Sequence, residues 1–227
     1  MARMLQDRDS TDSHLNTTRR HVRLCKQIKG AETLAEAIQP AYQQLQQKQA
    51  DTQAKAEARQ EAYDDLLLSD TDLDNAVRTT FEKCKQFDRE NPGLPVLAQI
   101  FPDQTYSSII NIPREQEPDV VEKLAIRLEN MGETHSLFPV AAELRARITT
   151  SRNTITAFHT AVREQKMAEA EEEIAQAALR QQYEINYLEA RKLFGRQTAE
   201  RLFPRLGAKA VKQTEPDTAE ESGETAE

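Results

Sequence analysis

The chain contains no tryptophan, and aromatic residues make up only 5% of its 227 residues. Hydrophobic residues amount to 38% and charged residues to 30%. A chain with so few large apolar side chains builds a thin core, and this composition is typical of long helices whose surface is large relative to their interior. A single large globule is therefore disfavoured.

Cysteine is also scarce, since only Cys25 and Cys84 occur and they form no C-x-x-C pair. Neither a disulfide framework nor a thiolate zinc site is predicted, and a reducing compartment fits best. The first residues lack the apolar core of a secretory signal, and no run of 18 apolar residues exists for a membrane span. We expect a soluble, cytoplasmic protein without a transmembrane segment.

The sequence strings that mark common catalytic sites are absent, including the phosphate-binding loops and the H-E-x-x-H and G-x-S-x-G motifs. A ferritin-like di-metal site needs Glu-x-x-His pairs, but no acidic residue stands three positions before any histidine. Cys84 shares a helical face with Val77 and Phe87, which indicates a buried thiol. We predict no catalytic residue, metal ligand, cofactor or small-molecule substrate, and a metal-dependent helical-bundle enzyme stays the second alternative.

Glycine and proline are missing from two long stretches, residues 41–91 and 140–194, while six of the nine prolines lie between them. Strong helix formers dominate both stretches, so each predicts one very long helix or two in series. The second has the clearer heptad spacing, with Ser151 in a core position and the pattern continuing through Tyr183, Leu188 and Leu193. The predicted fold class is all-α: an elongated antiparallel helical hairpin or coiled coil with small helical bundles at each end.

Alanines at positions 50, 54, 58 and 62 form a stripe that favours close packing of a partner helix. The predicted antiparallel register places residues 50–62 opposite residues 168–180, which are also rich in alanine. Three interruptions are expected: Gly30 closes a first short helix, Pro40 restarts or kinks the chain, and Ser69 begins a sequence that favours a break.

These patterns divide the chain into five predicted regions. They are a disordered N-terminus over 1–12, a base helical bundle of 13–45 with 186–206, a two-helix stalk of 46–70 with 163–185, a helical head over 71–162 that includes the proline-rich connection 92–118, and a disordered acidic tail over 207–227.

A basic amphipathic helix near the start of the chain is the most suggestive local feature. Its cations, which we take as the candidate partner-binding residues, share an arc of about 120° opposite an apolar side; they are Arg19, Arg20, Arg23 and Lys26. Such a face suits an anionic membrane surface, a nucleic-acid backbone or an acidic protein. The alternative is that the cations stay solvated or attract the acidic tail, which has six acidic and no basic residues after Lys212.

The net charge of −8 argues against nucleic-acid binding over the whole surface. The leading hypothesis is a non-enzymatic helical scaffold or adaptor that mediates protein–protein interaction or self-assembly. The first alternative is a basic-helix protein that binds an anionic surface, either membrane or nucleic acid. No family resemblance was identified in the sequence.

Overall fold

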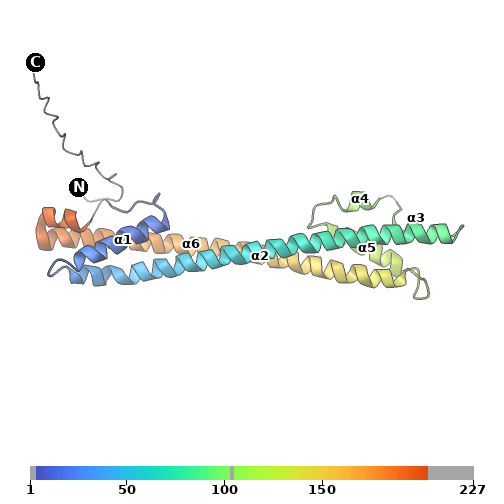
Figure 1. Cartoon of the computed structure of the whole chain (residues 1–227), viewed down its shortest axis with the longest axis horizontal. Coiled ribbons are helices and arrows are strands. Elements are labelled where there is room, and N and C mark those ends of the chain that lie inside the picture. The colour runs from blue at the N-terminus through green and yellow to red at the C-terminus, as the bar shows by residue number, and fades with distance from the viewer. Residues whose placement is uncertain (1–3, 103–104, 204–227) are drawn as a thin grey trace, which may run out of the picture. The chain divides into compact units, whose positions relative to one another are not determined.

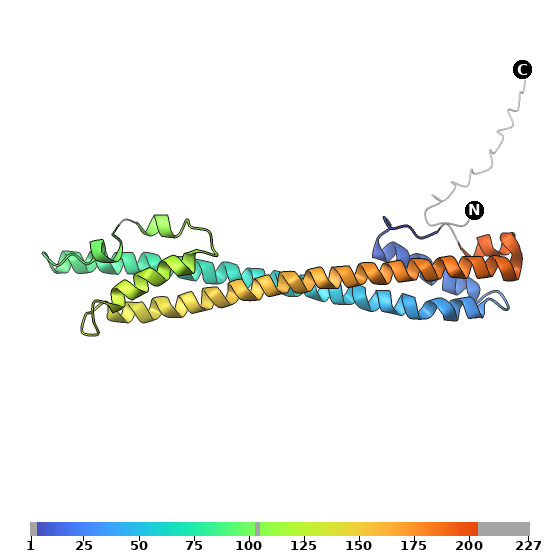
Figure 2. The same cartoon turned by 180° about the vertical axis from the view of Figure 1, so that it is seen from behind.

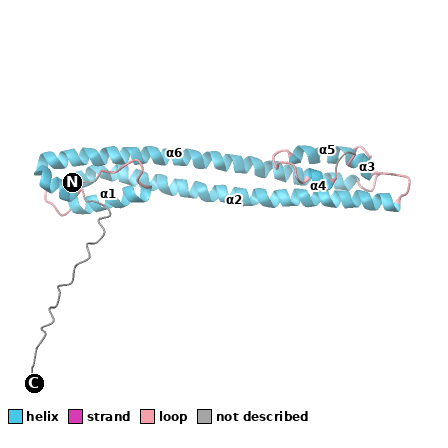
Figure 3. Cartoon of the chain, turned by 90° about the horizontal axis from the view of Figure 1, so that it is seen from above, coloured by secondary structure: helices cyan, strands magenta, loops and turns pink. Residues whose placement is uncertain are grey.

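All regular structure in the described residues, 4–102 and 105–203 of this computed structural model, is helical (Figure 3). The predicted all-α class is therefore confirmed. Figure 1 labels the helices, which are α1 (Thr11–Cys25), α2 (Glu32–Glu90), α3 (Leu97–Ile100), α4 (Tyr106–Ile109), α5 (Glu117–Glu129) and α6 (Phe138–Leu202). The predicted acidic tail over 207–227 lies outside the described residues.

The chain divides into two compact units, and α2 and α6 contribute to both. Unit 1 comprises residues 1–46 and 175–227, and unit 2 comprises residues 47–174. The two halves of the predicted stalk are thus grouped differently, because residues 175–185 belong with the base and residues 47–70 with the head. Within each unit, α2 and α6 lie side by side and run in opposite directions (Figure 1 and Figure 2).

The residues before α1 contact the rest of unit 1. Leu5 is buried, and Arg180 on α6 forms an ion pair of 2.7 Å with Asp7. Helix α1 then starts at Thr11, where the Ser10 hydroxyl accepts a hydrogen bond from Ser13 N. The disordered N-terminus predicted over 1–12 therefore includes residues that pack on unit 1.

Two of the three predicted interruptions do not break a helix. Gly30 does separate α1 from α2, with a φ of 89° that favours glycine. Pro40, however, lies inside α2, which continues through it. Ser69 is also helical and buried. Its hydroxyl forms a hydrogen bond of 2.6 Å with the Thr154 hydroxyl on α6 and does not cap a new helix.

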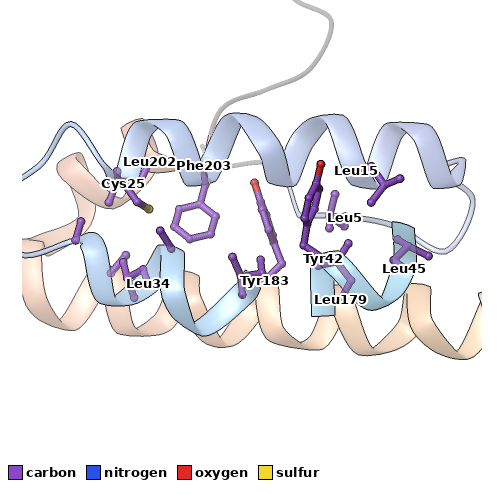
Figure 4. Close-up of a cluster of buried hydrophobic side chains, with 14 of the residues drawn as sticks. Leu5, Leu15, Cys25, Leu34, Tyr42, Leu45, Leu179, Tyr183, Leu202 and Phe203 are labelled. Carbon is purple, nitrogen blue, oxygen red and sulfur yellow. The ribbon is translucent and has the colours of Figure 1, made fainter. Parts of the chain in front are cut away.

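The core of unit 1 lies where α1, the start of α2 and the end of α6 meet (Figure 4). Its largest fully buried side chains are Tyr183, Phe203, Ile38, Leu45 and Leu179. The predicted continuation of the core through Leu188 and Leu193 is wrong, because these side chains are 62% and 56% exposed. The buried stripe instead passes from Tyr183 to Asn186 and Ala190.

Gly195 breaks the helical path near the end of α6, with a φ of 73° and a ψ of 173°. Only glycine adopts this backbone region readily, because a Cβ atom would meet the adjacent peptide groups. The short helical stretch that follows, ending at Leu202, returns along the bundle (Figure 1). Leu202 and Phe203 are thereby buried in the unit 1 core.

The core of unit 2 is formed by α2, α3, α4, α5 and the first part of α6. Helix α5 has a proline in its first turn and buries Val121, Leu124 and Ala125. Ser151 occupies the predicted core position and is 1% exposed. Cys84 is buried in the same core.

The register of α2 against α6 differs from the predicted one. Ser69 meets Thr154, whereas the predicted register places it opposite residue 161. The shift is seven residues at this pair and eleven at the ion pair of Lys55 with Glu164, and a shift by whole helical turns keeps the same faces toward each other. Periodicity alone therefore cannot distinguish the two registers.

The thinnest part of unit 2 contains only α2 and α6. Between residues 46 and 65, α2 buries no side chain completely, and the predicted packing stripe is wrong because Ala50, Ala54 and Ala58 are exposed. On α6, Ala168 is buried. The two helices are joined here by ion pairs instead, including Lys55 with Glu164 at 2.8 Å.

Candidate functional site

The predicted basic face lies on the outer side of α1. Arg20, Arg23 and Lys26 are exposed, and none of them forms an ion pair within the part of the chain that the structure describes. Arg19 is also exposed, but its Nε donates a hydrogen bond of 3.1 Å to the Tyr42 hydroxyl on α2. The structure therefore places three of the four predicted residues on α1 and Lys26 at its C-cap. Arg20, Arg23 and Lys26 have no side-chain partner in the described residues.

The opposite side of α1 is used in the core of unit 1. Leu15 and Cys25 are buried there with the two histidines of the helix, His14 and His21. An amphipathic helix that lies in a membrane surface buries its apolar side in lipid. In this fold that side is already covered by protein, so α1 offers a partner only its cations.

Charge is distributed unequally between the two units. Residues 1–46 and 175–227 carry 15 basic and 14 acidic side chains, whereas residues 47–174 carry 15 basic and 24 acidic ones. The basic face of α1 thus belongs to a unit that is close to neutral, and unit 2 carries the acidic excess. Unit 2 should therefore repel an anionic molecule more strongly than unit 1 does.

A polar network that sequence reasoning missed lies beneath α1. His21 is fully buried, and its Nδ1 lies 2.9 Å from the carbonyl oxygen of Leu202, so that Nδ1 carries the proton and donates it. Its Nε2 lies 3.2 Å from Nδ2 of Asn186 and accepts a hydrogen bond. The ring also packs on Phe203, with centroids 4.2 Å apart, and on Tyr183; Figure 4 shows both aromatic side chains.

Asn186 is held in one orientation by three hydrogen bonds. Its Nδ2 donates to His21 and, at 2.6 Å, to the carbonyl oxygen of Leu34 on α2, while its Oδ1 accepts from Gln182 Nε2. A second proton on His21 would face the amide donor, and a flipped amide would face the Leu34 carbonyl. Burial lowers the pKa of His21, and this network likewise requires the neutral ring.

A buried pair of carboxyl groups lies in unit 2, where Glu117 at the start of α5 meets Asp74 on α2. Glu117 is 2% exposed, and burial, followed by the adjacent Asp74 carboxylate, raises its pKa to about 8. Two carboxylates have no donor between them, so the proton on Glu117 supplies the hydrogen bond to Asp74. Nearby, Arg114 forms an ion pair of 2.9 Å with Asp70.

Exposed apolar side chains on α6 are the second feature that sequence reasoning missed. In unit 2, Met167 is 65% exposed and Ile174 is 68% exposed. Met167 lines a shallow groove of about 280 Å³ between α2 and α6, together with Ala54, Lys55 and Glu164. The sequence contains one sign of this surface. Met167 and Ile174 are seven residues apart and both lie outside the buried stripe of α6, which indicates a second apolar face.

The chemically reactive side chains do not form a catalytic arrangement in the described residues. Cys25 and Cys84 are fully buried, and burial raises the pKa of each thiol to about 12. His159 is exposed and its Nε2 contacts Glu115 at 3.0 Å. Among residues 4–102 and 105–203, no three His, Cys, Asp or Glu side chains gather in a way that would hold a metal ion.

Comparisons of the chain with protein-family models, curated proteins and solved structures found no match. In the part of the chain that the structure describes, no helix combines the length and the apolar character needed to cross a membrane. Function is therefore inferred from geometry and charge alone.

Proposed function

We propose that this protein is a non-enzymatic helical scaffold whose copies associate with one another through α6 in unit 2. The observation that carries the proposal is the exposure of Met167 and Ile174 on a section where α6 has only α2 beside it. Large apolar side chains at heptad spacing on an open helix face are typical of a coiled-coil contact.

A second copy suits this surface better than an unrelated partner because the surface is self-complementary. The groove beside Met167 is lined by both signs of charge, with Lys55 next to Glu164 and Glu171. Rotation by a two-fold axis brings such a surface against itself with apolar residues facing apolar residues and acids facing bases.

Replacement of Met167 and Ile174 by glutamate tests the proposal. Each substitution places a charge at the apolar contact, which should shift self-association to at least tenfold higher concentration. Sedimentation velocity over a concentration series measures the shift. The matched control places glutamate at Asn153 and Ala157, which are exposed positions of the same helix outside the apolar pair. Equal association of the two variants would contradict the proposal.

A second candidate function is the binding of an acidic partner by α1. It is favoured by Arg20, Arg23 and Lys26, which have no ion-pair partner in the described residues. Gln at these three positions and at Arg19 should abolish salt-sensitive retention on heparin. The control removes the same number of exposed cations elsewhere in unit 1, at positions 191, 192, 196 and 201. If both variants lose retention equally, the face of α1 has no special role.

A further inference from the structure

We propose that residues 213–227 of the same molecule bind the basic face of α1. The proposal rests on the second candidate function. It names the segment of the chain that an acidic partner would have to displace from the basic face. It also commits to an intramolecular contact, so it can fail while the candidate function stands.

Charge complementarity is the first argument. Residues 213–227 contain no basic residue, and their six acidic residues are Glu215, Asp217, Glu220, Glu221, Glu224 and Glu227. The face of α1 presents Arg20, Arg23 and Lys26 without an ion-pair partner in the described residues. The segment has no large apolar residue to bury, so charge is its only means of recognition.

The position of the last described residue is the second argument. Phe203 is buried against His21 of α1, and the Leu202 carbonyl accepts a hydrogen bond from the same histidine. The chain therefore leaves the core beside the helix that carries the basic face. Residues 204–212 span at most about 30 Å when extended, and α1 is about 22 Å long, so the acidic segment can reach any part of the face.

Three exposed cations near the end of α6 already have partners, which is the third argument. Arg196 pairs with Glu200 at 2.9 Å, Lys192 lies 3.7 Å from Glu189, and Arg191 lies over the Tyr187 ring. The end of α6 thus offers the segment only Arg201 without a partner among the described residues, whereas the face of α1 offers three such cations. The acidic excess of unit 2 repels the segment.

The acidic segment and the face of α1 belong to one chain, so even a weak electrostatic contact between them is formed most of the time. Segments joined by a short linker meet at an effective concentration of about 1 mM, whereas the same segments on separate molecules meet only at the protein concentration. Contact between exposed charges is screened once the salt concentration reaches about 0.5 M. The contact should therefore be intramolecular and reversible by salt.

Carbodiimide cross-linking of the full chain tests the proposal, because this reagent joins an amine to a carboxyl group only when the two are in contact. We expect mass spectrometry to find Lys26 joined to carboxyl groups of residues 213–227. The yield should fall at least fivefold at about 0.5 M salt. In a mixture of ¹⁴N- and ¹⁵N-labelled protein, the joined peptides should carry a single isotope. Lys192 is the control amine, since it is exposed but has a partner.

A variant with Gln at positions 19, 20 and 23 keeps Lys26 as the reporter and removes the charges that attract the segment. Its cross-link yield should also fall at least fivefold. Absence of the Lys26 cross-link, equal yield at Lys192 or predominance of mixed-isotope peptides would overturn the proposal. Heparin retention of a chain ended after residue 212 tests the α1 face separately. Retention that depends on the arginines, without the cross-link, would leave the candidate function standing and remove the intramolecular one.

Discussion

Buried titratable side chains give the two units opposite responses to pH. In unit 1, burial lowers the pKa of His21, so the folded state holds this ring neutral. In unit 2, burial and the neighbouring Asp74 raise the pKa of Glu117, so the folded state holds this carboxyl protonated. Acid therefore destabilises unit 1, where it would protonate His21, and base destabilises unit 2, where it would ionise Glu117.

Replacement of Glu117 by Gln should stabilise unit 2 above neutral pH. The pKa of Glu117 is about 8 in the folded state and 4.5 when unperturbed, so its stabilising contribution is full below pH 4.5 and is lost as the pH rises to 8. Gln keeps a donor for Asp74 without titrating, and the gain at pH 8 should be about 1–3 kcal/mol. Urea unfolding at pH 8 and pH 4.5 measures it, with the exposed Glu115→Gln as control. A gain of the same size at both pH values would contradict this account.

Replacement of His21 by Gln should weaken the acid sensitivity of unit 1. Because the folded-state pKa lies below the unperturbed 6.5, the contribution of His21 is full above pH 6.5 and is lost as the pH falls below it. The groups around the ring are uncharged; they are Cys25, Tyr183, Asn186, Phe203 and the Leu202 carbonyl. Unfolding free energies at pH 7.5 and pH 5 should differ less in the variant than in the unmodified chain.

His14, whose pKa burial also lowers, keeps part of the dependence. The exposed His159→Gln variant is the control, because it removes a histidine that lies outside the buried polar network. A His21→Gln variant with unchanged pH dependence would show that the polar network does not select the neutral ring.

Several residues were predictable and several were not. The core role of Ser151 and the burial of Cys84 follow from helical spacing. Asn186 was missed because a polar residue at a core position gives no hydrophobic signal, although its spacing from Tyr183 and Ala190 fits the buried stripe. The pairing of Glu117 with Asp74 depends on how α5 docks on α2, and no local pattern encodes that contact.

At the scale of elements, Gly195 determines where the end of α6 packs. Its backbone conformation is accessible mainly to glycine. Gly195→Ala should therefore cost about 1–3 kcal/mol of unfolding free energy and displace the segment that carries Leu202 and Phe203. Hydrogen exchange should report the displacement as faster exchange of α1, because His21 loses its Leu202 partner.

The neighbouring Arg196→Ala variant is the control for this prediction. It removes only an exposed ion pair with Glu200 and should leave the unfolding free energy nearly unchanged. If the two variants lose the same stability, backbone conformation at 195 is not what holds the segment in place.

The sequence predicts helix type better than helix contacts. The absence of glycine and proline from two long stretches correctly indicates α2 and α6. The break predicted at Pro40 does not occur, because one missing hydrogen bond does not end a helix that packs along its length. The predicted register of α2 against α6 differs from the observed one because a repeated pattern also fits itself after a shift by whole helical turns.

At the scale of the whole molecule, the open face of α6 favours assembly of copies. Lys55 and Glu171 border the same groove as Met167, so a second copy meets both apolar and ionic partners there. Charge steers the encounter, and the apolar contact determines how long it lasts. These features are the physical basis of the proposed scaffold.

A single spin label at Ala170, between Met167 and Ile174 on α6, tests the self-association most directly. One label per chain gives a dipolar signal in pulsed electron resonance only when two chains meet. We predict a defined inter-copy distance below about 40 Å, since packed helices lie about 10 Å apart and the label adds its own length. Excess unlabelled protein should remove the signal. A label that shows no dipolar partner at about 100 μM protein, far above the Kd of a specific protein complex, would contradict the scaffold.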